Sequence, residues 1–330
     1  MRESVLVVGG AGYIGSHTAK LLAKQDYEPV ILDNLSTGHR KAAGELALHV
    51  GSYEDAALVE RVLRTHKITT VMHFGARALV GESVADPLAY YQANVAGTLG
   101  LITGMLRAGV KRIVFSSTCA TFGTPAEIPI GEGVAQNPVN PYGRTKLFVE
   151  QILRDLAGAS DLRYAVLRYF NAAGADPEGA LGEDHDPETH LIPRAIQVAL
   201  GRAPKLTVYG SDYPTKDGSC VRDYVHVTDL AEAHVRAMKL IGTRDESFDF
   251  NLGSEHGYTV LEIVKAIERI SGRGVTCEIG ARRPGDPAVL IADSAKARKL
   301  LDWRCRHDLD SIIRTTFNWM EKNPNGYGKN

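Results

Sequence analysis

The sequence predicts an α/β protein, built on a doubly wound parallel sheet and completed by a smaller, mixed α/β domain at the carboxyl terminus. Three observations lead to this prediction. Short apolar runs alternate with helical periodicity through the amino-terminal half, glycines directly follow the first apolar run, and a stretch rich in Gly, Pro, Asp and Glu begins after residue 174. Regular alternation is typical of a parallel sheet that has helices on both faces and ligands at the carboxyl ends of its strands.

The amino-terminal half divides into alternating strands and helices. A four-residue apolar run at 5–8 indicates a buried parallel strand. The same pattern predicts further strands at 30–33, 70–73, 112–116 and 164–168. Helical spacing of apolar residues predicts intervening helices at 13–25, 55–66, 88–108 and 141–156.

The carboxyl-terminal half is less regular. Residues 175–189 are expected to form a loop, and helices are predicted at 192–200, 229–239, 260–270 and 310–322, with a strand at 248–252. Thr259 and Glu262 are spaced as a capping box for the third of these helices. We therefore expect one domain at 1–174, to which segments near 226–252 return, and a second at 175–330.

Composition and charge exclude several classes of protein. The 330 residues are 44% apolar, enough for a full core, and 38 basic residues nearly balance 39 acidic ones, so neither nucleic acid nor a membrane surface is the expected partner. Four well-separated cysteines favour a reducing compartment. The first residues run directly into a strand and no apolar run reaches membrane-spanning length. A cytoplasmic protein that binds a small molecule is expected.

A glycine-rich turn follows the first predicted strand. Gly9, Gly12 and Gly15 permit a tight turn and close approach of a pyrophosphate to a helix amino terminus, although such glycines alone also occur in ordinary turns. Asp33 ends the second strand 18 residues after Gly15 (33 − 15), where a carboxylate accepts hydrogen bonds from a ribose hydroxyl. Asn34 follows without an adjacent arginine, so NAD is favoured over NADP. The sheet domain is thus predicted to be a Rossmann-type domain.

A tyrosine and a lysine are spaced four residues apart at the start of the helix predicted at 141–156. Tyr142 and Lys146 therefore share one face, and a neighbouring ammonium and a nicotinamide cation lower the pKa of a phenol, making it a usable base. In isolation the pair is more often two surface side chains. Thr118, after the strand at 112–116, is expected to bring a hydroxyl to the same edge of the sheet.

These motifs together match the extended short-chain dehydrogenase/reductase pattern. Five further stretches resemble the UDP-glucose 4-epimerase family, and the resemblance covers essentially the whole chain: residues 12–17, 80–83, 167–171, 221–226 and 282–286. It implies an isomerase with tightly bound NAD that interconverts UDP-glucose and UDP-galactose through a 4-keto sugar. Tyr142 is then the base, Lys146 its electrostatic partner and ribose ligand, and Thr118 the hydroxyl that assists it.

The resemblance also implies binding residues. Contacts to NAD are expected from Gly9, Gly12, Tyr13, Ile14, Gly15, Asp33, Asn34, Ser52, Phe74, Asn94, Tyr142, Lys146 and Tyr169. Contacts to the UDP-sugar are expected from Thr118, Asn171, His190, Leu191, Arg222, Arg283, Asp286 and Leu290. Arginine forks suit a diphosphate, although each arginine alone is as often a solvated ion-pair partner.

Three residues depart from the family pattern. Ser52 replaces an aspartate that contacts adenine, which puts the strength of cofactor binding in doubt. Phe122 replaces a tyrosine and removes one hydroxyl near the site. Leu290 occupies a position where a tyrosine or a smaller residue is associated with whether N-acetylated sugars fit, so UDP-N-acetylhexosamines remain open as substrates.

Other interpretations stay open at this level. A 4-epimerase of UDP-xylose, UDP-N-acetylhexosamine or UDP-glucuronate is the nearest, followed by a non-catalytic NAD-binding regulator. A 4,6-dehydratase or a UDP-glucuronate decarboxylase calls for an acidic residue after Thr118, where this chain has Cys119 and Ala120.

No metal is expected, since His185 and His190 match no compact metal motif and their segment is expected to be a loop over the sugar nucleotide. Cys119 is expected to be a small buried residue. The family also implies a homodimer formed through the helices predicted at 88–108 and 141–156.

Overall fold

A seven-stranded parallel sheet forms the centre of the molecule. The computed structural model describes residues 2–283 and 286–328. The strand order is β10-β6-β5-β4-β1-β2-β3, with β1 at Ser4–Val8, β2 at Glu28–Asp33, β3 at Ala47–Val50, β4 at Thr70–His73, β5 at Arg112–Thr118, β6 at Arg163–Tyr169 and β10 at Phe248–Leu252. The predicted α/β class and parallel sheet are confirmed.

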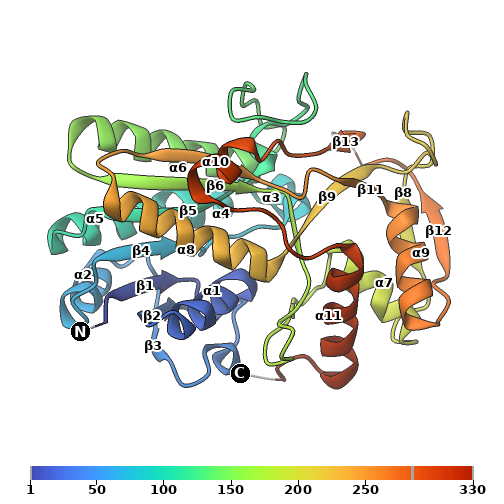
Figure 1. The fold of residues 1–330 in the computed structure, drawn as a ribbon, viewed down its shortest axis with the longest axis horizontal. Coiled ribbons are helices and arrows are strands. Elements are labelled where there is room, and N and C mark those ends of the chain that lie inside the picture. Colours follow the sequence, from blue (N-terminus) through green and yellow to red (C-terminus); the bar gives the residue numbers. More distant parts are fainter. Residues whose placement is uncertain (1, 284–285, 329–330) are drawn as a thin grey trace.

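Helices cover both faces of this sheet, because successive residues of each strand point to opposite sides. On one face, α1 (Tyr13–Lys24), α8 (Val227–Thr243) and α10 (Ala295–Leu301) pack against a core that includes Val7, Ile31 and Val114. On the other, α2 (Ala56–Thr65), α5 (Gly97–Ala108) and α6 (Pro141–Ala159) pack against a core that includes Val8 and Phe115. Figure 1 shows α1 and α8 side by side on their face of the sheet.

The helix predicted at 88–108 is three segments. A short α4 (Pro87–Tyr90) leads into a π-helical segment η2 (Tyr91–Ala96) and then into α5. The wider π-helical turn frequently marks a functional position, and it contains the buried Asn94. Two short helices also belong to this part of the chain, α3 (Val80–Ala85) and the 3₁₀ turn η3 (Cys119–Thr121), and a further 3₁₀ turn η1 lies at Arg40–Ala43.

The remaining strands and helices form a smaller body at one end of the sheet (Figure 1). Its helices are α7 (Leu191–Ala199), α9 (Val260–Ser271) and α11 (Leu309–Lys322), which share one apolar core. Its strands are β7 (Asn171–Ala173), β8 (Leu206–Tyr209), β9 (Val221–His226), β11 (Gly257–Thr259), β12 (Cys277–Gly280) and β13 (Val289–Leu290). β9 pairs with β7, β11 and β13, and β8 pairs with β12.

The capping box predicted at the start of α9 is present: the Thr259 hydroxyl accepts from the Glu262 amide, and the Glu262 carboxylate accepts from the Thr259 amide. β10 joins the large sheet beside β6 although 78 residues separate the end of β6 from its start (169 to 248). The division into domains at residue 174 stays a prediction. Within residues 2–283 and 286–328, no helix combines the length and the hydrophobicity that a membrane span requires.

Candidate active site

The glycine-rich turn has a backbone that side chains would obstruct. Gly9 has φ of +75°, and a Cβ added to Gly15 would lie 2.2 Å from the Gly9 carbonyl oxygen. Helix α1 then begins at Gly12 without a side-chain cap and without an acidic residue in its first turn. Its first backbone amides are therefore free to donate hydrogen bonds to an anion from outside the chain, which fits the pyrophosphate of NAD.

Asp33 lies at the end of β2, facing this turn. Its carboxylate accepts from the Ala11 amide at 2.9 Å and the Leu35 amide at 2.8 Å. Burial raises the pKa of Asp33, and these amides counteract the shift. A carboxylate that accepts one bond at each oxygen retains lone pairs for a ribose hydroxyl, so this residue also fits the cofactor.

Two neighbouring predicted ligands form local turns. The Asn34 side chain accepts from the Ser36 amide, and the Ser52 hydroxyl accepts from the Glu54 amide. Tyr13 instead contacts a segment that is distant in the sequence, since its hydroxyl donates to the Gly174 carbonyl at 2.5 Å. Tyr13 thereby ties the glycine-rich turn to the segment that leads into the smaller body, while Ile14 packs beside the core of the α1 face.

Tyr142, Lys146 and Thr118 converge at the carboxyl edge of β5. Helix α6 begins with Asn140 as its N-cap, which accepts from the Gly143 amide at 2.8 Å, and with proline at its first position. This start places Tyr142 against the end of β5, where a side-chain hydrogen bond with Thr118 acts on its phenol. Tyr142 is 9% exposed and Lys146 4%.

Burial dominates the electrostatics of the pair. It raises the pKa of Tyr142 strongly, and the lowering that the sequence predicts depends on the lysine ammonium and the nicotinamide cation together. The Lys146 ammonium donates to the Ser116 carbonyl at 2.9 Å and lies 4.8 Å from the centre of the Phe115 ring. Burial also lowers the pKa of Lys146 to about 7, which weakens its positive field on the phenol. The protein's own groups therefore do not supply the predicted lowering.

Three other predicted cofactor residues surround this edge. Asn94 uses three of its four hydrogen-bonding positions: it accepts from the Arg77 amide and donates to the Arg77 carbonyl and the Thr145 hydroxyl. Tyr169 shares a hydrogen bond of 3.0 Å with the Ser116 hydroxyl. Phe74 follows β4, and its ring lies 4.7 Å from that of His234.

Apart from Thr118 on β5, the predicted UDP-sugar ligands lie on the smaller body. Arg222 on β9 forms an ion pair with Asp286, and the Arg283 guanidinium lies 4.0 Å from the centre of the Tyr209 ring. A hydrogen bond from Arg283 lowers the pKa of Tyr209. The Asn171 amide donates to the Asp223 carbonyl at 2.8 Å. Residues 284 and 285, within the predicted motif at 282–286, lie outside the described residues.

Phe122 and Leu290, two of the departures from the family pattern, belong to one apolar cluster. They pack with Ile130, Phe170 and Ala292, close to Cys119. Phe122 is 1% exposed, and the Arg168 guanidinium carbon lies 5.6 Å from the centre of its ring. Burial raises the pKa of the Cys119 thiol to about 12, which keeps it protonated and unreactive.

A buried ion network, which was not predicted from the sequence, connects α6 to β6 and β10. Glu150, one turn after Lys146 and fully buried, accepts from Arg168 at 2.8 Å and from the Ser117 hydroxyl at 2.6 Å. Arg168 also reaches Asp249 on β10 at 2.9 Å. A charged residue within the strand predicted at 164–168 was the available signal, since a buried arginine requires carboxylate partners.

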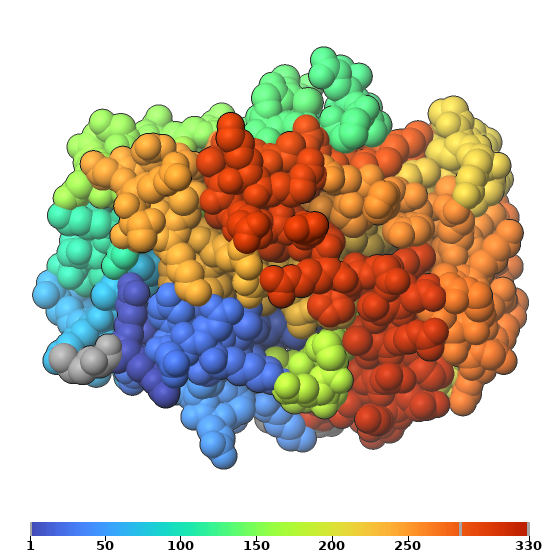
Figure 2. All heavy atoms as spheres, in the orientation of Figure 1, coloured from blue at the N-terminus to red at the C-terminus, as the bar shows by residue number. Residues whose placement is uncertain are grey.

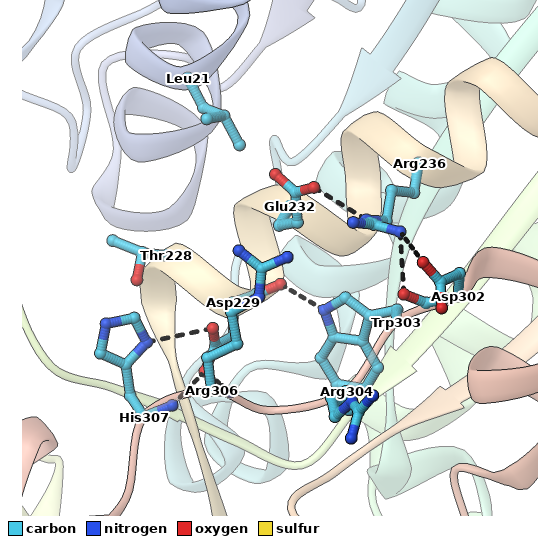
Figure 3. Close-up of a pocket in the computed structure, with 10 residues that line it drawn as sticks. All are labelled: Leu21, Thr228, Asp229, Glu232, Arg236, Asp302, Trp303, Arg304, Arg306 and His307. Carbon is cyan, nitrogen blue, oxygen red and sulfur yellow. Dashed lines mark hydrogen bonds and ion pairs between the residues drawn. The ribbon is translucent and has the colours of Figure 1, made fainter.

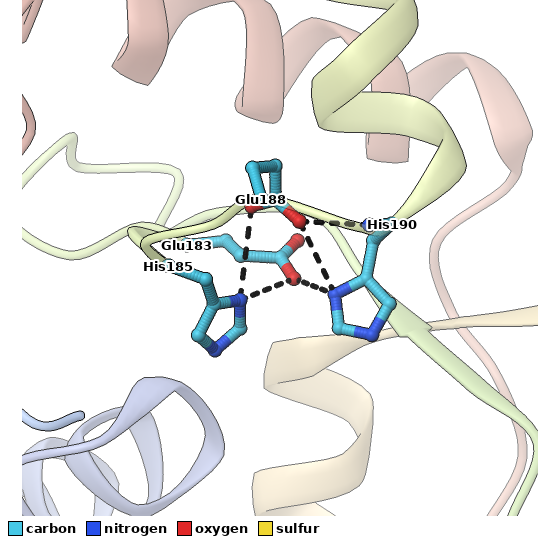
Figure 4. Close-up of side chains that lie close together, drawn as sticks. All are labelled: Glu183, His185, Glu188 and His190. Atoms are coloured by element: carbon cyan, nitrogen blue, oxygen red, sulfur yellow. Dashed lines mark hydrogen bonds and ion pairs between the residues drawn. The ribbon is translucent and has the colours of Figure 1, made fainter. Parts of the chain in front are cut away.

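A second cluster lies beside the predicted ligands His190 and Leu191, at the start of α7. Glu183, His185, Glu188 and His190 place one ligand atom each within 4.8 Å of one another (Figure 4). The two histidines had been noted in the sequence, but the side-chain geometry of this loop depends on its contacts with α1 and with the carboxyl terminus.

A separate pocket of about 360 Å³ lies between α1, the start of α8 and residues 302–307 (Figure 3). Asp229 organises it by accepting from the amides of Arg306 and His307, and the Trp303 indole donates to the Asp229 carbonyl at 2.7 Å. None of the predicted site residues lines it. Its contacts attach the chain after α10 to α8.

The chain is similar along its length to proteins of known activity. Residues 5–253 match the NAD dependent epimerase/dehydratase family. A UDP-glucose 4-epimerase of Rhizobium leguminosarum bv. trifolii is 51% identical over 320 residues, covering 97% of this chain and 98% of the relative. The crystal structure of UDP-glucose 4-epimerase from Brucella ovis in complex with NAD has a TM-score of 0.94 at 52% identity and covers 96% of this chain and 98% of its own.

A third similarity concerns both ligands. The structure of UDP-glucose 4-epimerase from Bifidobacterium longum in complex with NAD+ and UDP has a TM-score of 0.93 at 42% identity, covering 98% of this chain and 99% of its own. Together with the converging Thr118, Tyr142 and Lys146, these similarities place the chain in the NAD dependent epimerase/dehydratase family and, within it, among the UDP-glucose 4-epimerases.

Proposed function

We propose that the protein is an NAD-dependent isomerase that interconverts UDP-glucose and UDP-galactose. The observation that carries this proposal is the convergence of Thr118, Tyr142 and Lys146 at the carboxyl edge of β5, in a chain 45–51% identical to UDP-glucose 4-epimerases over nearly its whole length. Bound NAD supplies the reversible oxidant for C4 of the sugar.

The side chains divide the remaining work. Tyr142 removes the proton of the sugar 4-hydroxyl, and Thr118 passes or holds that proton through its hydrogen bond with the phenol. Lys146, whose pKa burial lowers to about 7, is a positive partner that stabilises charge on the phenol. The resulting 4-keto sugar turns in the site, and reduction on its other face inverts C4.

Binding is divided between the two parts of the chain. Residues 1–174, with 226–252, hold NAD through the glycine-rich turn and Asp33, and residues 175–330 hold the UDP-sugar. Arg222 and Arg283 recognise the diphosphate by charge-assisted hydrogen bonds. Arg222 is paired with Asp286 in this structure, so substrate binding exchanges or shares that partner.

The protein also acts as a cytoplasmic homodimer in this proposal. Support comes from large apolar side chains that are exposed on two adjacent elements: Leu99 (45%) and Leu106 (50%) on α5, and Phe148 (43%) on α6. Such a surface is typical of a protein interface. Light scattering tests the dimer: a mass near 36 kDa, that of one 35.8 kDa chain, contradicts it.

Purified protein is expected to convert UDP-galactose to UDP-glucose with NAD present. Tyr142→Phe removes the base and is expected to lower turnover at least about 100-fold while NAD binding persists. Tyr27→Phe, at the opposite end of the sheet before β2, is the control. Retention of more than a tenth of the turnover by Tyr142→Phe contradicts the role of the phenol, and conversion of UDP-xylose alone contradicts the substrate assignment.

A further inference from the structure

The loop before α7 contains two carboxylates and two imidazoles that contact one another (Figure 4). Glu183, whose side chain is 1% exposed, lies 3.2 Å from Nδ1 of His185 and 2.5 Å from Nδ1 of His190. Glu188 lies 3.7 Å and 3.6 Å from the same two nitrogens and accepts from the amides of residues 189 and 190. The pairing of all four groups fixes the direction of both rings.

The geometry is that of an ion-pair cluster. Four ligands of a tetrahedral zinc ion lie about 3.3 Å apart, from bond lengths near 2.0 Å. Three of the contacts between carboxylate and imidazole, at 3.2–3.7 Å, are close to that spacing, but His190 and Glu183, at 2.5 Å, form a direct hydrogen bond. Two imidazoliums also balance two carboxylates. Burial lowers the pKa of His185, but Glu183 and Glu188 outweigh it and raise that pKa to about 10; Glu183 likewise raises the pKa of His190.

Both rings turn their Nδ1 atoms to the carboxylates and their Nε2 atoms the opposite way, as Figure 4 shows. Neither Nε2 has a hydrogen-bond partner among residues 2–283 and 286–328. The ring centres are 5.4 Å apart. Two charged N–H donors thus lie on the same side of the cluster without an acceptor among the described residues, and each can donate to a phosphate oxygen.

The cluster connects the two binding regions. The His185 ring meets the ring of Tyr13, the first residue of α1, edge to face, with ring centres 6.3 Å apart, and His190 is the N-cap of α7. Lys20 on α1 pairs with Asp176 and Glu178 of the same segment. In Figure 2 this segment, in yellow-green, reaches the surface between the blue amino-terminal residues and the red carboxyl-terminal ones.

We propose that His185 is an additional ligand of the diphosphate of a bound nucleotide, acting beside His190, and that Glu183 is the positioning residue that keeps both imidazoles charged and aligned. This inference rests on the proposed function for the identity of the nucleotides. The diphosphate belongs either to NAD, at the glycine-rich turn, or to the UDP-sugar, at the start of α7, and both present the same chemistry to the two donors.

The groups that face the cluster from other elements set the background for a pH test. They are Tyr13 and His17 on α1, which both interact with Glu183. Behind them, Tyr327 near the carboxyl terminus acts on Tyr13, and Asp176 at the start of the loop acts on His17. Burial lowers the pKa of His17 to about 4 and raises that of Tyr327 to about 12. Neither titrates between pH 6 and 9, where the test is made.

The experiment uses Glu183→Gln, which keeps an acceptor at the same place and removes the charge. UDP and NAD binding are measured by calorimetry at pH 6 and pH 8.5, beside UDP-galactose turnover. Without the carboxylate the pKa of each imidazole falls toward its ordinary value near 6.5. Binding of one nucleotide is expected to weaken about ten-fold at pH 8.5, the effect of one charge-assisted hydrogen bond, and to recover at pH 6.

His185→Gln removes the charged donor itself, and it is expected to weaken binding of the same nucleotide at both pH values. Glu178→Gln is the matched control, since Glu178 attaches the same loop to α1 through Lys20 and Lys24 without contacting the imidazoles. A weaker NAD affinity shows that His185 contacts the diphosphate of the cofactor, and a weaker UDP affinity shows that it contacts the diphosphate of the substrate. Because binding is measured directly, a wild-type protein inactive toward UDP-galactose contradicts the proposed function without deciding the inference.

Three outcomes overturn the inference. Unchanged binding of both nucleotides in Glu183→Gln and His185→Gln is the first. A loss equal at pH 6 and pH 8.5 in Glu183→Gln, or an equal loss in Glu178→Gln, is the second, because it indicates only displacement of the loop. Stoichiometric retention of Zn²⁺ by the wild-type protein is the third, because the metal then replaces the two protons.

Discussion

The position of Tyr142 depends on the small size of the residue that follows it. A Cβ added to Gly143 would lie 2.5 Å from the Ala120 carbonyl oxygen and 2.9 Å from the Pro138 side chain, against 3.4 Å for the shortest ordinary contact. Gly143→Ala therefore requires the start of α6 to move away from η3 by about 0.9 Å (3.4 − 2.5). That movement displaces the Tyr142 phenol from Thr118 at the end of β5.

A displacement near 1 Å costs about 100-fold in rate. Gly143→Ala is therefore expected to lower the kcat for UDP-galactose by about that factor, and overpacking is expected to lower the free energy of unfolding by about 1–3 kcal/mol. Turnover is measured at saturating substrate, and unfolding by urea titration.

Gly158→Ala, in the last turns of the same helix, is the control, since a Cβ there has no atom within 4 Å. It is expected to keep full activity and to stabilise the protein by up to about 1 kcal/mol. If Gly143→Ala retains half of the wild-type kcat, the close approach of α6 to η3 does not set the position of the phenol, and the reasoning fails.

Three further results are expected. Arg168→Met leaves the Glu150 carboxylate buried without its main partner and should lower the free energy of unfolding by about 3–5 kcal/mol; a loss under about 1 kcal/mol in urea titration contradicts this. Leu290→Tyr adds bulk beside the predicted sugar site and should lower kcat/KM for UDP-N-acetylgalactosamine, relative to UDP-galactose, by about ten-fold; an unchanged ratio removes this residue from substrate selection. Contacts with Glu183 and a second carboxylate outweigh burial and raise the pKa of His185 to about 10. The charged imidazole therefore stabilises the folded protein fully below its unfolded pKa of about 6.5, and this stabilisation is lost as the pH rises through 10. His185→Ala should therefore lower Tm more at pH 6 than at pH 10.5, and equal losses argue against a charged imidazole.

Local patterns predicted six of the seven strands of the main sheet, because those strands are largely buried. The short elements were missed for the opposite reason. β3, β7 and β13 have two to four residues, too few for periodicity to separate from a loop. The interruption at η2 was also missed, because its residues continue the helical pattern and only the hydrogen bonds of Asn94 with Arg77 and Thr145 reveal why this turn is fixed.

The sequence by itself determined the features whose cause is local. The glycine-rich turn requires residues without a Cβ, Asp33 ends a strand, and Tyr142 and Lys146 share a face because four residues make about one helical turn. Each of these depends on neighbours within a few positions, so the order of residues carries the information.

Only the tertiary structure decided how charge and volume are shared between distant segments. It placed Phe122 and Leu290 in one cluster, connected Arg168 on β6 to Glu150 on α6, and buried Tyr142, which raises the pKa of its phenol. Burial and long-range ion pairs arise from groups that lie far apart in the chain, and their energies depend on distances and on water exclusion that exist only after folding.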